Sequence, residues 1–270
     1  MRDEHARAGY LSRMPTSEPS ADESSANESG AGESSARESS TSEPRPGVLF
    51  DIDGTLVDTN YFHAVAWQRA FRQEGVQVTM TEVHHHIGQG ASSLMDAVAP
   101  DRDKGRDDVV EAAHSEHYAS FFGVLQTFPK VRDLLRTLAD RGAEVVLATS
   151  ASERELQALR DALDIEDALA TVTSSADAEQ AKPAPDIIEV ALDRAGLSAD
   201  RSIMVGDTIW DVASASAAGL PCIGVLTGGI SRGELLAAGA VAVYDDVAQL
   251  LEQLDESPIG ALLRGERAAA

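Results

Sequence analysis

Three aspartates stand where a short apolar run ends, in the segment DIDGTLVD, residues 51–58. Buried carboxylates are costly to desolvate unless a positive charge neutralises them. One carboxylate can attack phosphorus and form a covalent intermediate, while a second can protonate the leaving oxygen and later deprotonate water. We therefore predict that Asp51 is a nucleophile and that Asp53 is the general acid and base. Gly54 permits a sharp turn directly after them.

Polar side chains also follow later apolar runs of the chain. Thr149 and Ser150 follow the second run, Asp207 and Asp211 follow the fourth, and Lys182, one of three lysines, lies in the segment AKPAPD. Because ligands bind outside the carboxyl ends of parallel strands, we expect these groups to meet at one edge of a sheet. We predict that Thr149, Ser150 and Lys182 bind phosphate there.

This concentration of carboxylates indicates a metal ion. An anionic phosphoryl group would repel both Asp51 and Asp53, so a hard cation is needed between them. Mg²⁺ prefers oxygen ligands and needs only one or two carboxylates, the rest being water and substrate oxygens. We predict Mg²⁺ as the cofactor, with Asp51 and Asp207 as ligands.

Each of these residues also has an ordinary structural explanation. An Asp-Gly pair commonly makes a turn, as Asp53 with Gly54 would do. Thr149 and Ser150 could cap the following helix, and Asp211 could be a favourable charge at a helix N-terminus. None of these explanations accounts for all the residues gathering at one edge, which favours a site.

The elements that position these residues alternate between apolar strands and helices, which predicts a doubly wound, Rossmann-like parallel sheet of the α/β class. Strands are expected at 48–51, 145–148, 170–173, 203–205, 222–225 and 241–243. Helices are expected at 61–74, 107–122, 131–140, 152–163, 185–195, 211–218, 234–238 and 247–254. Asp58 and Thr59 are expected to cap the first helix.

The chain between the first two strands is much longer than the roughly 30 residues of a βαβ unit. We predict that residues 60–127 form a small helical cap on a core made of residues 47–59 and 128–256. Residues 1–46 are expected to be a disordered Ser/Glu-rich tail, because residues 15–47 contain no large apolar side chain. Residues 257–270 are expected to be a frayed tail.

Four segments resemble the motifs of the haloacid dehalogenase superfamily, in its branch with a helical cap after the first strand. They are DIDGTLVD (51–58), VLATS (146–150), KPAPD (182–186) and VGDTIWD (205–211). This branch includes phosphoglycolate phosphatase-like enzymes. The resemblance implies that the backbone carbonyl of Asp53 is a third magnesium ligand, that Asp211 supports Asp207 or Lys182, and that Gly54 and Thr55 support the site.

The resemblance implies a Mg²⁺-dependent phosphatase that hydrolyses a small phosphate monoester through an aspartyl-phosphate. Dehalogenases of the superfamily lack an acid two residues after the nucleophile, so Asp53 argues against them. Phosphonate-cleaving relatives use a cap lysine, but Lys104, the only lysine in the cap, lies in an Asp/Arg-rich loop. A beta-phosphoglucomutase-like mutase shares all four motifs and stays an alternative. A non-catalytic binding or regulatory protein is a further alternative.

The residues Gly88, Gln89 and Gly90 form the expected specificity loop of the cap. The surrounding segment, HHHIGQGAS, contains no Arg or Lys to grip a second phosphate, which favours hydrolysis over mutase chemistry. We interpret its three histidines as a polar cap segment, and His114 and His117 as an ordinary solvated surface.

Composition limits the partners of the protein. The net charge is −23, with 45 acidic against 22 basic residues, which argues against nucleic-acid and anionic-membrane surfaces. The single cysteine, Cys222, lies in an apolar run and is expected in the core, and no run is long enough to cross a membrane. We expect a cytoplasmic monomer whose partner is a small phosphorylated metabolite.

Overall fold

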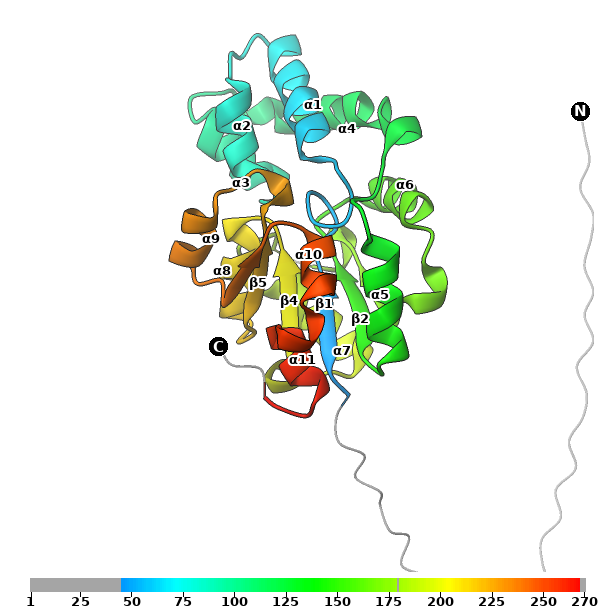
Figure 1. Ribbon diagram of the computed structural model, residues 1–270. Coiled ribbons are helices and arrows are strands. Elements are labelled where there is room, and N and C mark those ends of the chain that lie inside the picture. Colours follow the sequence, from blue (N-terminus) through cyan, green and yellow to red (C-terminus); the bar gives the residue numbers. More distant parts are fainter. Residues whose placement is uncertain (1–44, 179, 268–270) are drawn as a thin grey trace, which may run out of the picture. The chain divides into compact units, whose positions relative to one another are not determined.

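The computed structural model describes residues 45–178 and 180–267 (Figure 1). They form a six-stranded parallel sheet in the order β3-β2-β1-β4-β5-β6, which confirms the predicted doubly wound fold. The strands overlap all six expected ones and are β1 Gly47–Phe50, β2 Glu144–Ala148, β3 Thr171–Thr173, β4 Ser202–Gly206, β5 Cys222–Val225 and β6 Ala242–Tyr244. Almost all of the expected tail, residues 1–46, lies outside the described residues.

Helices cover both faces of the sheet, because alternate residues of each strand point to opposite sides. Val48 and Phe50 join an apolar cluster with α5, α6, α10 and α11, whereas Leu49 joins a second cluster with α7, α8 and α9. Cys222 is buried in the second cluster, as expected. These helices are α5 Val131–Asp140, α6 Glu153–Leu163, α7 Asp186–Ala195, α8 Ile209–Ala217, α9 Arg232–Ala238, α10 Val247–Glu252 and α11 Pro258–Leu263.

The strand order reverses next to β1. From β1 the chain builds the sheet to one side through β2 and β3, and then crosses to the other side with β4, β5 and β6. β1 lies between β2 and β4, and all of its residues are buried. A crevice forms at such a switch point, because the connections on its two sides leave in opposite directions. Residues that follow β1 and β4 are therefore brought to one place in the molecule.

Four helices are inserted between β1 and α5, and Figure 1 shows them at the end of the sheet where β1 finishes. They are α1 Asn60–Gln73, α2 Met80–His86, α3 Ala91–Val98 and α4 Asp107–Ala119. Their apolar side chains form a separate cluster that includes Trp67, Phe71 and Leu94. We call these elements the inserted helices; their exact division from the core at residues 60 and 127 stays a prediction.

The chain enters and leaves the inserted helices along neighbouring paths. Asp58 N donates to Gln126 O at 3.0 Å, and Phe128 N donates to Leu56 O at 3.0 Å. Val57 also forms an isolated bridge with Thr127. Both connecting segments are thus fixed to each other before they diverge.

Three expectations from the sequence are wrong in their details. Part of the expected frayed tail is α11, whose Ile259 is fully buried against the core, because Ser257 caps this helix and Pro258 starts it. Thr59 makes no side-chain cap to α1. His114 is buried rather than solvated, because its ring stacks on Trp67 at 4.1 Å.

Within residues 45–178 and 180–267, no helix has both the length and the apolar character that a membrane crossing requires.

Candidate active site

Lys182 is the centre of a buried charge cluster at the carboxyl edge of the sheet. Its Nζ atom donates to Asp51 Oδ1 at 2.5 Å and to Asp211 Oδ1 at 2.7 Å. The lysine side chain is only 1% exposed, and neither carboxylate exceeds 8%. Asp51 comes from the end of β1, whereas Asp211 lies in the first turn of α8. Residues far apart in the sequence therefore meet as the sequence predicts.

The N-terminus of α8 fixes the Asp211 carboxylate. Thr208 caps this helix, and its backbone N and Oγ1 both donate to Asp211 Oδ2, at 3.0 and 2.6 Å. Gly206 allows this arrangement, because a Cβ atom there would lie 2.5 Å from Asp211 Cγ. Of the two supporting roles expected for Asp211, the geometry favours holding Lys182.

Asp207 lies at the end of β4 and is completely buried. Thr55 Oγ1 donates to its Oδ1 atom at 2.8 Å, and Asn60 Nδ2 donates to its Oδ2 atom at 2.8 Å. A Cβ atom at Gly54 or Gly228 would come within 2.4 or 1.7 Å of Asp207 Oδ2, so both positions need glycine. The role of Asn60 was not predicted, since nothing marks this first residue of α1 in the sequence.

Side chains at the start of the inserted helices hold Asp53 in place. Its Oδ1 atom accepts from Thr59 Oγ1 at 2.7 Å and lies 3.3 Å from His63 Nε2. His63 Nδ1 lies 3.1 Å from His114 Nε2, and the His63 ring stacks on Tyr118 at 3.8 Å. Sequence reasoning missed His63, although it lies four residues after Thr59, a separation that brings side chains together on a helix.

The electrostatics of Asp53 and His63 follow from their contact. Burial alone would raise the pKa of Asp53, but the hydrogen bond and the charge of His63 hold it below its usual value. Burial alone would lower the pKa of His63, but its hydrogen bond to Asp53 raises this pKa above the usual value. The pair therefore favours an ionised carboxylate beside a protonated imidazole.

The negative charges of Asp51 and Asp207 are not fully neutralised by neighbouring groups. Burial raises the pKa of Asp51 to about 7, although Lys182 opposes this shift. Burial, followed by the charges of Asp211 and Asp51, raises the pKa of Asp207 well above its usual value. Burial would lower the pKa of Lys182, but Asp211 and Asp51 raise it. The cluster thus contains three carboxyl groups and one lysine, so the lysine alone cannot neutralise all three when they are ionised.

The donor set fits a hard divalent cation. One oxygen from each of Asp51, Asp207 and Asp211 lies within 4.8 Å of the others. Asp211 is engaged by the charged Lys182 and by Thr208. Among the described residues, Asp207 accepts only from neutral side chains and Asp51 has a second oxygen without a hydrogen bond, so Asp51 and Asp207 are the better ligands. Carboxylate oxygens at this spacing suit Mg²⁺.

A cavity of about 230 Å³ opens beside these groups. Asp51, Asp53 and Lys182 line it from the core, together with Thr149 and Ser150. Thr149 and Ser150 do not cap α6, since Ser152 does so, and Thr149 Oγ1 instead accepts from Ala151 N at 3.1 Å. The residues predicted to act on phosphate therefore face one space.

The expected specificity loop lies between α2 and α3 and also lines this cavity. A Cβ atom at Gly88 would lie 3.0 Å from Thr208, and one at Gly90 would lie 2.3 Å from Ala181 Cβ. Glycine lets the loop approach the core closely on both sides. The inserted helices thus contribute one wall of the cavity.

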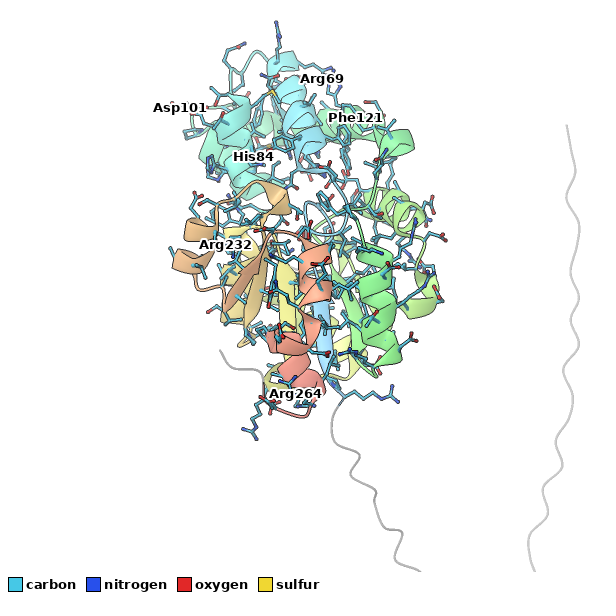
Figure 2. All side chains as sticks on the ribbon, in the orientation of Figure 1. Arg69, His84, Asp101, Phe121, Arg232 and Arg264 are labelled. Carbon is cyan, nitrogen blue, oxygen red and sulfur yellow. The ribbon has the colours of Figure 1, made fainter. Side chains whose placement is uncertain are left out.

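The helix that precedes this loop contacts the core through the histidine segment. His84, labelled in Figure 2, lies on the core-facing side of the inserted helices, and its Nε2 atom is 2.8 Å from Gly228 O. Trp210 Nε1 donates to His85 O at 3.4 Å, and its ring stacks on His86. The three histidines therefore form part of the contact between α2 and the core.

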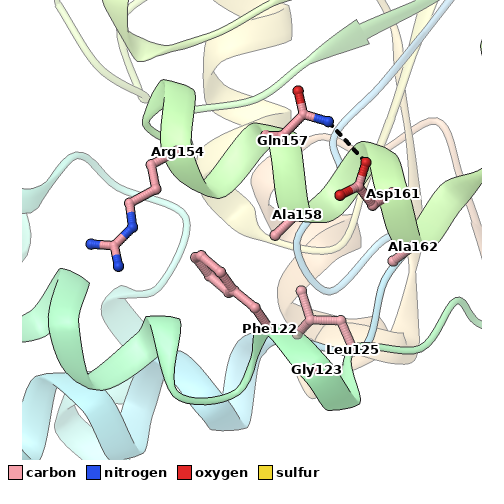
Figure 3. Close-up of a pocket in the computed structure, with 8 residues that line it drawn as sticks. All are labelled: Phe122, Gly123, Leu125, Arg154, Gln157, Ala158, Asp161 and Ala162. Atoms are coloured by element: carbon pink, nitrogen blue, oxygen red, sulfur yellow. Dashed lines mark hydrogen bonds between the residues drawn. The ribbon is translucent and has the colours of Figure 1, made fainter.

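A larger cavity of about 770 Å³ lies elsewhere, beside α6 (Figure 3). None of the predicted site residues reaches it, and one wall carries a Gln157 to Asp161 hydrogen bond of 2.8 Å. The smaller cavity is the better candidate, because nucleophile, acid and phosphate-binding groups converge there. The residues that line the larger one are Phe122, Gly123, Leu125, Arg154, Gln157, Ala158, Asp161 and Ala162.

The fold and the site together define an α/β enzyme with buried acids at the switch point of its sheet. A model of the haloacid dehalogenase-like hydrolase family matches residues 48–225. The phosphoglycolate phosphatase of Rhodospirillum rubrum is 32% identical over 213 residues, 75% of this chain and 88% of that protein. The pyrophosphatase PpaX of Bacillus pumilus is 28% identical over 180 residues, 66% of this chain and 82% of that protein.

Solved structures agree with this assignment. A hydrolase from Pseudomonas syringae superposes with a TM-score of 0.75 at 28% identity, covering 79% of this chain and 99% of that one. A provisionally assigned beta-phosphoglucomutase from Bacteroides vulgatus superposes with a TM-score of 0.73 at 20% identity, covering 82% and 91%, and shows the shared fold. The chain belongs to the haloacid dehalogenase-like hydrolase family. It is a hydrolase of the phosphatase type.

Proposed function

We propose that the protein is a Mg²⁺-dependent phosphatase that hydrolyses a small phosphate monoester through an aspartyl-phosphate on Asp51. The observation that carries this proposal is the pairing of Asp51 with Lys182 beside Asp207, with Asp53 two residues away at the same cavity. The names of relatives make phosphoglycolate the first compound to test.

The reaction would proceed in two steps. Lys182 holds Asp51 Oδ1, whereas Oδ2 accepts no hydrogen bond from a described residue and is free to attack phosphorus. The bond between phosphorus and the leaving oxygen breaks, and that oxygen takes a proton through Asp53, which receives it from the protonated His63 beside it. Asp53 then removes a proton from water, the water oxygen attacks phosphorus, and the bond to Asp51 breaks to release phosphate.

The surrounding residues would control charge and protons. Bound by Asp51, Asp207 and the backbone carbonyl of Asp53, Mg²⁺ would neutralise charge on the phosphoryl oxygens. Lys182 and Thr149 would hold those oxygens in the orientation that attack requires. The raised pKa of His63 keeps a proton on its ring, next to Asp53. This proton can pass to the Asp53 carboxylate.

The substitution Asp51→Asn tests the nucleophile. We expect turnover to fall by about 10³-fold or more, because the amide cannot form the covalent intermediate. Phosphate release is measured with Mg²⁺ and again after chelation with EDTA, and mass spectrometry of acid-quenched wild-type enzyme should reveal one added phosphoryl group. The matched control is Asp133→Asn, at an exposed position remote from the site. Near-normal phosphate release by Asp51→Asn would refute the proposal.

The same assay separates the alternatives. A phosphosugar mutase would convert a sugar monophosphate into its isomer without releasing phosphate. A non-catalytic protein would release no phosphate from any ester and would be indifferent to Asp51→Asn.

A further inference from the structure

The cavity beside Asp51 has few positive groups for a substrate to use. Lys182 is the only lysine or arginine among the described residues that line it, and its Nζ atom is already engaged by Asp51 and Asp211. His63 also lines it, but its ring is paired with Asp53, so an anionic group on the leaving side of a substrate would find no unpaired cation among the described lining residues. The described lining therefore disfavours a leaving group with its own carboxylate or phosphate.

Glu155 lines the same cavity and has an unsatisfied oxygen. The residue is only 7% exposed, and its Oε2 atom accepts from Ser152 N and Oγ, both at 2.9 Å. Its Oε1 atom is buried and has no hydrogen-bond partner among the described residues. A buried acceptor without a donor is costly, so such an atom indicates a missing partner.

Glu111 adds a second carboxylate to this wall. It comes from α4 of the inserted helices and lines the same cavity as Glu155. Partial burial, followed by the charges of Asp108 and Glu155, raises the pKa of Glu111, in keeping with neighbouring carboxylates along this wall. Uncharged polar residues of the same lining include Gln89, Ser115 and Ser175.

We propose that the site takes a phosphate monoester of a small amino alcohol, whose ammonium group donates to Glu155 Oε1 and faces Glu111. This inference rests on the proposed phosphatase function. A cavity of about 230 Å³ suits a phosphoryl group with a leaving group of only a few atoms. Phosphoglycolate would instead bring its carboxylate towards two carboxylates of the same sign, which repel it.

The test compares three esters of similar size that differ in one group: 2-aminoethyl phosphate, 2-hydroxyethyl phosphate and phosphoglycolate. We expect kcat/KM to be at least tenfold higher for the ammonium ester than for phosphoglycolate, with the hydroxyl ester between them. Glu155→Gln and Glu111→Gln should each lower the preference for the ammonium over the hydroxyl ester about tenfold. Glutamine keeps an oxygen for the cap at Ser152 but removes the charge.

The matched control is Glu153→Gln, at an exposed position on the same helix as Glu155, which should leave the preference unchanged. If Glu155→Gln lowers the melting temperature so far that its kinetics cannot be measured, the substrate preference of Glu111→Gln is the test. The Glu111 side chain is exposed, so this substitution should leave the fold intact. A preference for phosphoglycolate, or an unchanged preference in both glutamine variants, would overturn the inference.

Acetyl phosphate, a small activated phosphoryl donor, keeps the two proposals distinguishable. If the wild type hydrolyses acetyl phosphate and Asp51→Asn does not, the enzyme transfers phosphoryl groups through Asp51, regardless of which leaving group it prefers. Turnover of acetyl phosphate without turnover of the ammonium ester would overturn the substrate inference alone. No turnover of any of the four compounds would overturn the phosphatase proposal itself.

Discussion

At the scale of single residues, Lys182 makes the charge cluster possible. Its side chain is 1% exposed and bridges Asp51 and Asp211, which belong to different elements. Without it, two buried carboxylates would face each other with no positive charge between them. Removing one partner of a buried ion pair costs about 3–5 kcal/mol, because the remaining charge is left uncompensated.

The substitution Lys182→Met keeps the length of the side chain and removes its charge. We expect the free energy of unfolding at pH 8 to fall by about 3–5 kcal/mol and phosphate release to be lost. The deficit should shrink as pH falls, because the carboxylates then become protonated and no longer need the lysine. Urea unfolding of the wild type and of Lys182→Met at pH 8 and pH 5 measures this loss of unfolding free energy.

Lys130→Met is the control for this prediction, since Lys130 pairs with Asp133 on an exposed surface. It should change stability by less than about 1 kcal/mol at either pH. A deficit for Lys182→Met that is equally small would show that the buried pair contributes little.

At the scale of elements, α11 shows how a short helix is fixed by packing rather than by composition. Its two buried apolar residues, Ile259 and Leu262, are spaced three apart, so that both lie on the face against the core. The surrounding alanine and charged residues obscure this short pattern in the sequence. The segment was expected to fray for that reason.

The substitution Ile259→Ala tests whether α11 belongs to the cooperative unit. We expect the free energy of unfolding to fall by about 2–4 kcal/mol, because the deleted side chain is fully buried. Thermal or urea unfolding measures the change, with Glu266→Ala at an exposed position of the same segment as the control. If both variants unfolded like the wild type, α11 would be frayed in solution.

At the scale of the whole molecule, the excess negative charge of the site couples metal binding to stability. Burial raises the pKa of Asp51 to about 7, far above the roughly 3.9 of an unfolded aspartate. A group with a raised folded pKa stabilises the metal-free protein below about pH 4, and this contribution is lost as pH rises through about 7. Asp207 shifts in the same direction, so a bound cation should matter most at high pH.

We therefore expect Mg²⁺ to raise the melting temperature more at pH 8 than at pH 5. The physical reason is that Mg²⁺ binds the ionised carboxylates and competes with protons at low pH. Thermal unfolding with Mg²⁺ or EDTA at the two pH values measures the effect, and Asp51→Asn should reduce it. An equal Mg²⁺ effect at both pH values would contradict this account of the site.

Much of the fold and of the charge cluster could be predicted from the sequence. Apolar runs mark the strands, and residues such as Asp51 and Asp207 follow them directly, so the sheet topology alone brings them together. The helices α2 and α3 were not predicted, because they are short and their polar residues conceal the apolar positions. The role of Asn60, which donates to Asp207 from the start of α1, had no signal in the sequence.

The sequence by itself determined the doubly wound sheet and the acids at its edge, because both follow from local hydrophobic periodicity and from the order of strands. Only the tertiary structure decided which partners hold those acids. The contact of His63 with Asp53, the burial of His114 and the free oxygen of Glu155 all depend on how the inserted helices pack over the core. Such contacts join residues distant in the chain, and no periodicity along the sequence encodes them.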